Sequence, residues 1–448
     1  MTSNPLKLGL TVCWIATSAL QYGFHIAALN SSASSIICDA SRAPTERHAA
    51  LGRPSCVDMS DAAFGTVTSA YTVGGLVGSL GAGGMLERWG KKGTAVRSAA
   101  LVVLGASAVS FGSSLLVLVL GRILIGVSCG IATVLVPLYL SSVAPPSIAG
   151  GIGILTQISI NVGIFAAQGF SIPLSTPGTG NWRFVSLISI AVAAAQILTS
   201  PLVPESRAKD ASSARGYEEI ADEGRTPLAA DDEAPAPRRK DDDPDQSLSV
   251  SEILRSPDPA VRKALWTLVA VMLFQQFSGI NAVMYYSTKI LTAVNPGSAK
   301  MVSLYVTLVN LVMTFPAVSL IDRLGRRTLL LFSLASMSAS TAVLGWAINT
   351  DHFTLASAGI IAFVVSFALG LGPVPFVLVG ELPPKQASSA TASIAVAVNW
   401  LSNLVVGVGF LPLRDWLAGP SGDRSGSVFW VFTALTALGV VVVGRLVR

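Results

Sequence analysis

Twelve apolar stretches, each long enough to cross a bilayer as a helix, constrain most strongly how this chain folds. Six lie at 8–29, 63–86, 95–111, 115–140, 148–170 and 182–203, and six more at 264–286, 302–321, 328–348, 355–379, 393–413 and 428–446. About 20 apolar residues span the roughly 30 Å hydrocarbon core of a membrane. Because backbone polar groups need partners inside lipid, such runs predict helices. The sequence therefore predicts an all-α membrane protein with 12 transmembrane helices.

Charge is concentrated in one segment of the chain. The 448 residues include 30 Lys and Arg and 25 Asp and Glu, and residues 205–263 hold 25 of these 55 charges. A soluble domain carries charge on about a quarter of its residues, which is far more than the rest of this chain carries. The composition excludes a water-soluble globule, a nucleic-acid-binding protein and a disulfide-knotted secreted peptide.

The charged segment divides the chain. Residues 205–263 are rich in Ala, Pro, Asp, Glu and Ser, and they contain too few large apolar residues to offset the entropy of the chain. We predict a cytoplasmic, largely disordered acidic linker here, with short helical order near 248–254. The linker separates an N-terminal six-helix half, 1–204, from a C-terminal six-helix half, 264–448.

Orientation follows from the basic residues of short loops, which mark the cytoplasmic side. They cluster after the second helix of each half, at Arg88, Lys91, Lys92, Arg97, Arg323, Arg326 and Arg327. This predicts cytoplasmic termini and a first loop, residues 31–61, on the opposite side. Cys38 and Cys56 share that loop, where an oxidising lumen permits a disulfide.

The same loop sequence occurs twice. The segment LERWGKK at 86–92 returns as IDRLGRR at 321–327, so every position is offset by 235 residues. Both copies lie between the second and third helix of a six-helix half. This correspondence indicates internal duplication, which is typical of transporters whose halves move about a site at the middle of the membrane.

These loops resemble those of the major facilitator superfamily. The runs QYGFH at 21–25, QQFSGINAV at 275–283, GPVP at 372–375 and NW at 399–400 are more specific and resemble the sugar porters, which include facilitative glucose transporters and proton-coupled hexose symporters. The resemblance implies the major facilitator fold, with two pseudo-symmetric six-helix halves. It also implies alternating-access transport of a monosaccharide, most readily a hexose such as glucose, by facilitated diffusion.

Uncharged amides are the candidate substrate contacts. Amide groups donate and accept hydrogen bonds without net charge, which suits the hydroxyls of a sugar. On one continuous helix, Gln275, Gln276 and Asn281 share a face; the alternative is that each amide only bonds a neighbouring helix. The resemblance implies sugar contacts at Gln157, Gln275, Gln276, Asn281, Asn310, Asn399 and Trp400, with Phe376 where glucose facilitators have Trp. Met272 and Ala368 replace a Gln and a Glu, so the pocket has fewer polar groups.

Gating residues are implied in the same way. Gly372, Pro373 and Pro375 interrupt the tenth helix and predict a hinge, although a static kink remains the alternative. The resemblance implies a cytoplasmic charge network and conformational role for Glu87, Arg88, Arg122, Glu205, Asp322, Arg323 and Glu381. Ser142, Ala149 and Ser388 stand where an acid and two Arg are expected. We therefore expect a weak inner gate and a preference for an inward-open state.

His25 departs most clearly from the resemblance. Proton-coupled sugar porters have Asp at this position and uniporters generally have Asn. An imidazole near its ordinary pKa senses an acidic compartment, and an ionisable group inside the membrane is a functional hypothesis by default. A neutral imidazole also replaces Asn as a hydrogen-bonding group. Both readings stay open, so proton-coupled transport using His25 is one alternative function.

A second alternative function is a sugar sensor that binds sugar in the same pocket but does not transport it.

The sequence offers no catalytic or cofactor motif. No phosphate-binding loop, metal-ligand cluster or nucleophile–base pair has the spacing that its chemistry needs, so we expect neither an enzyme nor a metal or cofactor. The expected partners are a small-molecule sugar and the lipid bilayer, with a monomer as the functional unit and no nucleic acid. A resemblance to a fungal branch of the family points to a vacuolar or plasma membrane.

Overall fold

The computed structural model describes residues 5–29, 32–38, 48–144, 149–176, 178–203, 248–284, 299–419 and 424–447. Within them, ten helices are long and apolar enough to cross a membrane. One of the ten, α3 (Asp61–Phe111), contains the second and third predicted spans, because Gly90 with φ 67° only kinks it. The first predicted span is α1 (Pro5–Ala27), which lies outside those ten. The predicted all-α membrane fold is confirmed.

The remaining long helices of the first half are α4 (Leu115–Val143), α5 (Ala149–Leu174) and α6 (Trp182–Thr199), which continues into η4 (Ser200–Leu202). Between α1 and α3 lie α2 (Ala33–Ile36) and a short β-hairpin whose strands have two residues each. Its strands β1 (His48–Ala49) and β2 (Arg53–Pro54) pair antiparallel around η2 (Ala50–Gly52).

The second half begins with α8 (Val250–Arg255) and α9 (Pro259–Phe277). It continues with α11 (Ala299–Leu324), α12 (Arg326–Asn349), α13 (Phe353–Leu369), α14 (Val374–Glu381), η6 (Lys385–Ala387), α15 (Ser388–Ala418), η7 (Ser425–Ser427) and α16 (Val428–Leu446).

The end of the predicted linker is helical. A capping box at Ser249 and Glu252 begins α8, and Pro259 follows the N-cap Asp258 to begin α9 five residues before the predicted boundary. Ile253 of α8 packs into a small apolar cluster with Leu265 of α9 and Ala390 of α15. The helical order expected near 248–254 is present as α8, and α9 begins within the last residues of the predicted linker, whereas residues 204–247 lie outside the described ranges.

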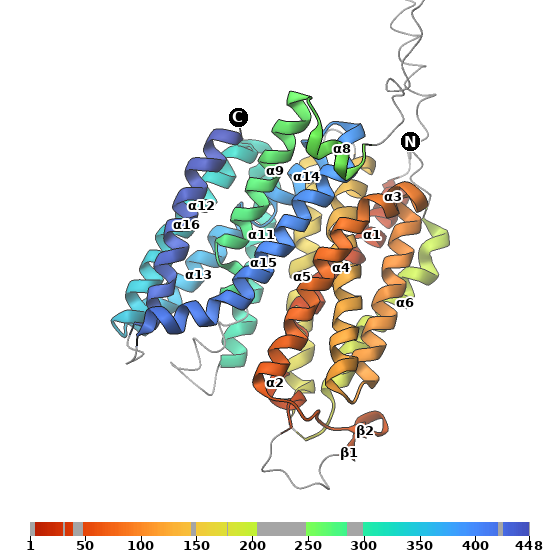
Figure 1. Cartoon of the computed structure of the whole chain (residues 1–448), viewed down its shortest axis with the longest axis vertical. Helices are drawn as coiled ribbons and strands as arrows, with labels where there is room; N and C mark the ends of the chain where they lie inside the picture. The colour runs from red at the N-terminus through yellow and green to blue at the C-terminus, as the bar shows by residue number, and fades with distance from the viewer. Residues whose placement is uncertain are drawn as a thin grey trace, which may run out of the picture.

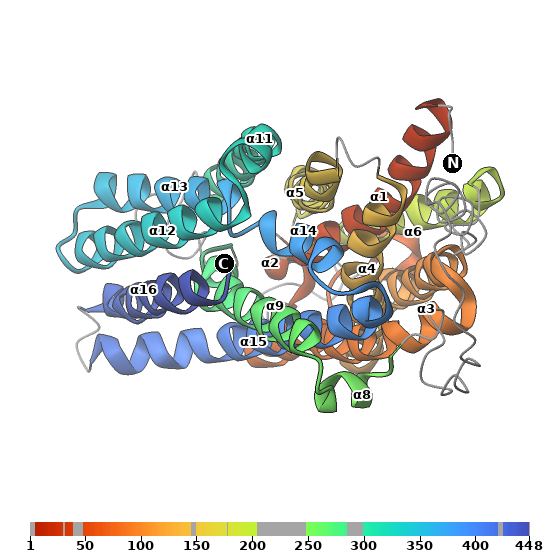
Figure 2. The same cartoon turned by 90° about the horizontal axis from the view of Figure 1, so that it is seen from above.

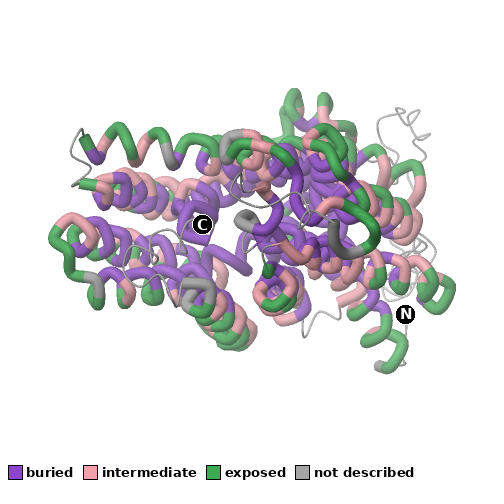
Figure 3. Tube along the Cα trace, turned by 90° about the horizontal axis from the view of Figure 1, so that it is seen from below, coloured by how far each residue is buried: buried purple, intermediate pink, exposed green. Residues whose placement is uncertain are grey.

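Two groups of helices stand side by side (Figure 1). They meet where α15 runs along α3 and α11 runs along α5 (Figure 2). Both termini and α8 lie at one end of the molecule, here called the linker end, whereas α2, β1 and β2 lie at the opposite loop end. Buried residues concentrate where the groups meet, and exposed ones cover the outer sides (Figure 3).

Two helices are interrupted near the middle of the bundle. The chain turns at Ser278 and Gly279, where Gly279 has φ 87°, and becomes helical again from Ile280. A side chain at Gly279 would also come within 2.8 Å of Phe432, so only glycine fits this turn. The continuous helical face predicted for 275–281 is therefore wrong. The second interruption separates α13 from α14 at residues 370–373, as the two prolines predict.

Candidate functional site

A small cavity of about 50 Å³ lies between the two groups of helices, which is less space than the roughly 300–1,000 Å³ of ligand sites, so the halves are closed tightly around it in this structure. Six predicted substrate contacts line it: Gln157, Gln275, Gln276, Asn281, Asn310 and Phe376. The other lining residues are Tyr22, Ile26, Ile160, Asn161, Ile164, Ile280, Met284 and Phe367. The wall thus combines uncharged amides with apolar and aromatic groups.

On the C-terminal side of the cavity, four amides form a continuous hydrogen-bonded chain. Asn281 Nδ2 donates to Gln276 Oε1 at 2.6 Å, which brings the two side chains together across the turn at Gly279. Gln276 Nε2 donates to Asn399 Oδ1 at 3.1 Å, and Asn399 Nδ2 donates to Gln275 Oε1 at 2.8 Å. Each amide is held in one orientation by the next.

The chain ends at the interruption between α13 and α14. Gln275 Nε2 donates to the carbonyl oxygens of Leu371 and Gly372, at 2.9 and 3.1 Å. The turn with Pro373 leaves these carbonyls outside a regular helical ladder. Gln275 therefore lines the cavity and also fastens the break, so a ligand-facing role and an interhelical role meet in one residue.

Asn399 and Trp400 lie one layer behind the cavity wall and are not part of its lining. Asn399 orients the two glutamines. Trp400 packs against the rings of Tyr22 and Tyr71, with centroids 5.3 and 5.4 Å away, and its Nε1 donates to Thr133 Oγ1 at 3.2 Å. A sugar in this cavity meets Tyr22 before it meets Trp400, which the resemblance did not predict.

Beside the break between α13 and α14, two apolar residues stand where the resemblance to glucose facilitators leads one to expect a Gln and a Glu. Met272 and Ala368 are fully buried, and the rings of Phe367 and Phe376 face the cavity. This side offers carbon faces for the carbon–hydrogen face of a sugar. Hydrogen bonding is concentrated on the amides of α5, α9 and α11.

His25 lies outside the cavity lining and is hydrogen-bonded to Ser189 of α6, which is itself paired with Gln21 of α1. The Ser189 hydroxyl donates to Gln21 Oε1 at 2.9 Å, and Gln21 Nε2 donates to the Ser189 carbonyl at 2.8 Å. Because that hydroxyl proton is committed, His25 Nε2 is the donor in its 2.7 Å contact with Ser189 Oγ. Arg122 reaches the backbone instead, donating to the carbonyl of His25 at 3.1 Å. A neutral imidazole satisfies this arrangement.

The predicted charge network is only partly formed. Arg326 holds Glu381 through two hydrogen bonds of 2.9 and 3.1 Å and lies 3.7 Å from Asp322. Among the described residues, Glu87, Arg88 and Arg323 take part in no ion pair, and Glu205 lies outside those residues. Arg326 lies four residues after Asp322, across the break at Gly325 between α11 and α12, and it faces Glu381, so it takes the place predicted for Arg323.

The repeated loops fasten each half to itself. Lys92 Nζ donates to the Val203 carbonyl after α6, and Arg327 Nη2 donates to the Gly444 carbonyl in α16, at 2.7 and 2.9 Å. The two donors occupy the same position of the repeat, and both acceptors lie at the C-terminal end of the last long helix of a half or just after it. We call these the two clasps. Basic groups at helix C-termini complete carbonyls that have no helical partner.

At the linker end the two halves are in close contact. A Cβ at Gly380 of α14 would lie 2.8 Å from the Cβ of Ser141 of α4, and one at Gly153 would lie 2.9 Å from Val377. The structure is therefore closed at this end, and the preference for an inward-open state stays a prediction. Small residues allow α4, α5 and α14 to approach without ion pairs.

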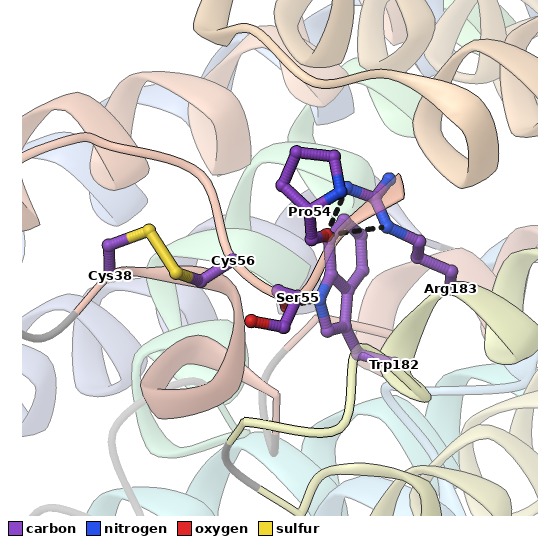
Figure 4. Close-up of a disulfide and its surroundings, with 6 residues drawn as sticks. All are labelled: Cys38, Pro54, Ser55, Cys56, Trp182 and Arg183. Carbon is purple, nitrogen blue, oxygen red and sulfur yellow. Dashed lines mark hydrogen bonds between the residues drawn. A yellow bond between two sulfur atoms is a disulfide. The ribbon is translucent and has the colours of Figure 1, made fainter. Parts of the chain in front are cut away.

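At the loop end, a disulfide joins Cys38 to Cys56 (Figure 4). The residues before Cys56 are held by the start of α6: Trp182 Nε1 donates to the Ser55 carbonyl at 2.8 Å, and the Arg183 guanidinium donates to the Pro54 carbonyl at 3.0 Å. Arg183 is fully buried and also donates to the carbonyl of Gly112. The first loop is thus fixed to α3 and α6 of its own half.

Comparison with known proteins agrees with this arrangement. The family model described as "Sugar (and other) transporter" matches residues 10–447. A probable metabolite transport protein of Saccharomyces cerevisiae is 30% identical over 461 residues, covering 98% of this chain and 91% of that protein. The facilitated glucose transporter member 7 of solute carrier family 2 from Mus musculus is 30% identical over 450 residues, covering 95% and 84%.

Solved structures show the same fold. A major facilitator proton:xylose symporter bound to 6-bromo-6-deoxy-D-glucose has a TM-score of 0.79 at 20% identity, covering 99% of this chain and 97% of that one. The family match over nearly the whole chain and the repeated loops in two groups of helices lead to one identification. The chain belongs to the sugar transporter family of the major facilitator superfamily, and it is an integral membrane sugar transporter rather than an enzyme.

Proposed function

We propose that this transporter carries a hexose such as glucose by alternating access and facilitated diffusion. The observation that carries the proposal is the chemistry of the cavity, which is lined by amides from both halves and by aromatic and aliphatic groups, with no charged residue among its described lining. Such a wall matches a neutral polyol with a carbon face. It does not match an organic acid or an amine, which needs a counter-charge when desolvated.

Binding at the junction of the halves couples the sugar to their movement. Gln157 and Asn161 come from α5 of the first half, whereas Gln276 and Asn281 come from the second. A sugar that bonds both groups favours states in which the halves come together around it. The name of the mouse relative supports glucose as the first substrate to test.

Uniport is favoured over proton coupling by the surroundings of His25. The imidazole is 2% exposed, lies outside the cavity lining and takes part in no ion pair among the described residues. Its partner is a hydroxyl rather than a carboxylate. A group that exchanges protons during transport needs a route to water and a charge partner that changes between states. The proton:xylose symporter has the same fold, so this point requires its own test.

We also propose that the linker end is cytoplasmic, in a vacuolar or plasma membrane. The basic clasp residues follow the kink of α3 (Lys92) and begin α12 (Arg327), and their carbonyl partners Val203 and Gly444 lie next to the linker and near the C-terminus. Basic residues in such short connections between spans are enriched on the cytoplasmic side. The disulfide loop then faces the lumen or the exterior, where a disulfide persists. The cavity is complete within one chain, which supports a functional monomer.

The test is radiolabelled D-glucose uptake into liposomes that contain the purified protein, with L-glucose as the control for leakage. We expect saturable uptake of D-glucose that stops at equal concentrations and ignores an imposed pH gradient. Accumulation above equilibrium with an inward proton gradient would show symport. Binding without flux would show a sensor, and a lack of both binding and flux for every hexose would overturn the proposed substrate.

A further inference from the structure

We propose that Asn161, through its side-chain oxygen, is a positioning residue that fixes two sugar-facing amides so that the cavity presents hydrogen-bond acceptors. The inference deepens the proposed hexose transport and rests on it. Asn161 comes from α5, four residues after Gln157, and is 1% exposed. It lines the cavity at the seam between α5 and α11.

The Asn161 side chain uses both its oxygen and its nitrogen. Its Oδ1 accepts from Gln157 Nε2 at 3.0 Å and from Asn310 Nδ2 at 3.1 Å. Its Nδ2 donates to Thr314 Oγ1 at 2.7 Å. The Thr314 hydroxyl donates to the Asn310 carbonyl at 2.7 Å, so it is free to accept from Asn161. The donors and acceptors match throughout, which assigns the orientation of the Asn161 amide.

This orientation decides which edge of Asn310 a ligand meets. Because Asn310 Nδ2 is held by Asn161, the other side-chain atom, Oδ1, is the one left over. Asn310 is 2% exposed, lines the cavity, and its Oδ1 accepts no hydrogen bond from the part of the chain that the structure describes. A buried carbonyl oxygen without a donor is costly. A sugar hydroxyl supplies the missing donor.

The amide of Gln157 is turned in the same way. Its Nε2 points to Asn161, so its oxygen is the group left for a ligand. Two acceptors then require hydroxyl groups that donate. Fluorine in place of a hydroxyl accepts weakly but cannot donate, so replacement at the contacted ring position removes the bond without a large change of shape. The selectivity between hydroxyl and fluorine therefore reports the orientation that Asn161 imposes.

The variant is Asn161→Leu, which keeps the number and branching of the side-chain heavy atoms and removes both the acceptor and the donor. Asn161→Ala is a second variant with less risk of steric conflict. The matched control is Thr314→Val, which removes the acceptor of Asn161 Nδ2 together with the hydroxyl's bond to the Asn310 backbone carbonyl, and leaves Oδ1 to hold Gln157 and Asn310. Size-exclusion chromatography in detergent shows whether each variant is folded and monodisperse.

The measurement is competition of each monodeoxyfluoro-D-glucose with radiolabelled D-glucose uptake in liposomes. In the unaltered protein, fluorine at one or two ring positions weakens competition roughly tenfold, as expected when a site loses one hydroxyl donor. In Asn161→Leu, the fluorinated sugars at those positions compete within about twofold as well as unlabelled D-glucose. The reason is that a released Asn310 amide rotates and offers its N–H, to which fluorine can accept. Thr314→Val keeps the tenfold ratio.

Three results would overturn the inference while leaving hexose transport in place. One is a fluorine ratio below about twofold at every position in the unaltered protein. Another is an unchanged ratio in Asn161→Leu or Asn161→Ala. The third is that Thr314→Val loses the discrimination against fluorinated sugars as fully as Asn161→Leu does. That result would assign the discrimination to the contact between α5 and α11 as a whole rather than to the Asn161 oxygen. A protein that neither binds nor carries any hexose contradicts the proposed function itself, and the role of Asn161 with it.

Discussion

Gln275 Nε2 donates a hydrogen bond of 3.1 Å to the carbonyl oxygen of Gly372. The bond crosses from α9, beside the cavity, to the interruption between α13 and α14. The same nitrogen also holds Leu371. A ligand that shifts the hydrogen-bonded amides of Gln275, Gln276 and Asn399 therefore also shifts the donor that holds the carbonyls of Leu371 and Gly372 between α13 and α14.

Gln275→Leu is expected to slow transport more than it weakens binding. The substitution leaves two buried carbonyls without donors, at about 1–3 kcal/mol each, so the position of α14 becomes variable. We expect a maximal uptake rate at least roughly tenfold lower, with a smaller change in KM. Gln275→Leu that raises KM and keeps the maximal rate would show instead that the residue only contacts sugar. Initial uptake rates over a range of glucose concentrations give both values.

His25→Asn is expected to transport glucose at a rate within about twofold of the unaltered protein. Asn keeps an uncharged N–H donor beside Ser189, although its Nδ2 stops short of the position of the imidazole Nε2, so a small adjustment of the side chains restores the contact. His25→Leu, which cannot donate, is expected to reduce both uptake and thermal stability. The measurement is liposome uptake at external pH from about 5 to 7.5. If the unaltered protein concentrates glucose with a proton gradient and His25→Asn does not, His25 is a coupling site and uniport is wrong.

The double variant Cys38→Ser, Cys56→Ser is expected to lower the melting temperature. The bridge closes a loop with a sequence separation of 18, and the entropy of such a loop corresponds to about 3 kcal/mol. Reduction of the unaltered protein should reproduce the shift. Cys13→Ser is the matched control, since Cys13 is a free and exposed thiol. An unchanged melting curve for the double variant would show that Trp182 and Arg183 alone hold the loop.

Gly380→Val is expected to open the linker end. Its Cβ would meet Ser141 Cβ at 2.8 Å and the Pro137 carbonyl oxygen at 3.1 Å, so α4 and α14 must separate. Gly84→Val is the control, because a Cβ there meets nothing within 4 Å.

Opening is measured as the distance between spin labels on Ser142→Cys and Lys385→Cys, in a Cys13→Ser background. We expect the longer-distance population to rise severalfold in Gly380→Val and to stay unchanged in Gly84→Val. A distribution that is already long in the unaltered protein, without sugar, would confirm the inward-open preference expected from the missing charges.

Much of the fold follows from local sequence, because lipid imposes helices on long apolar runs. The break near Pro373 follows from proline chemistry. The break at Gly279 is harder to predict, because a single glycine inside an apolar run is common in membrane helices. It depends on Phe432, which lies more than 150 positions away in the chain and closes around the turn.

The composition of the site is more predictable than its connections. Resemblance pointed to Gln157, Asn310 and the amides of α9, all of which line the cavity. It could not show that Asn399 and Trp400 lie behind the wall. Asn161 carried a weak signal, a second amide one helical turn after Gln157. Its importance depends on Asn310 and Thr314, which only the packing of α5 against α11 brings near.

The two clasps have a mechanical consequence. Lys92 and Arg327 each tie the turn after the second helix of a half to its sixth helix, and neither reaches the other half. In the proposed alternating-access cycle, a half that is fastened to itself would tilt as one body. The bonds that must change are then those between the halves, such as Asn161 to Thr314 and Trp400 to Thr133. Neither clasp residue lines the cavity, so a substitution among the sugar-facing residues leaves both clasps in place.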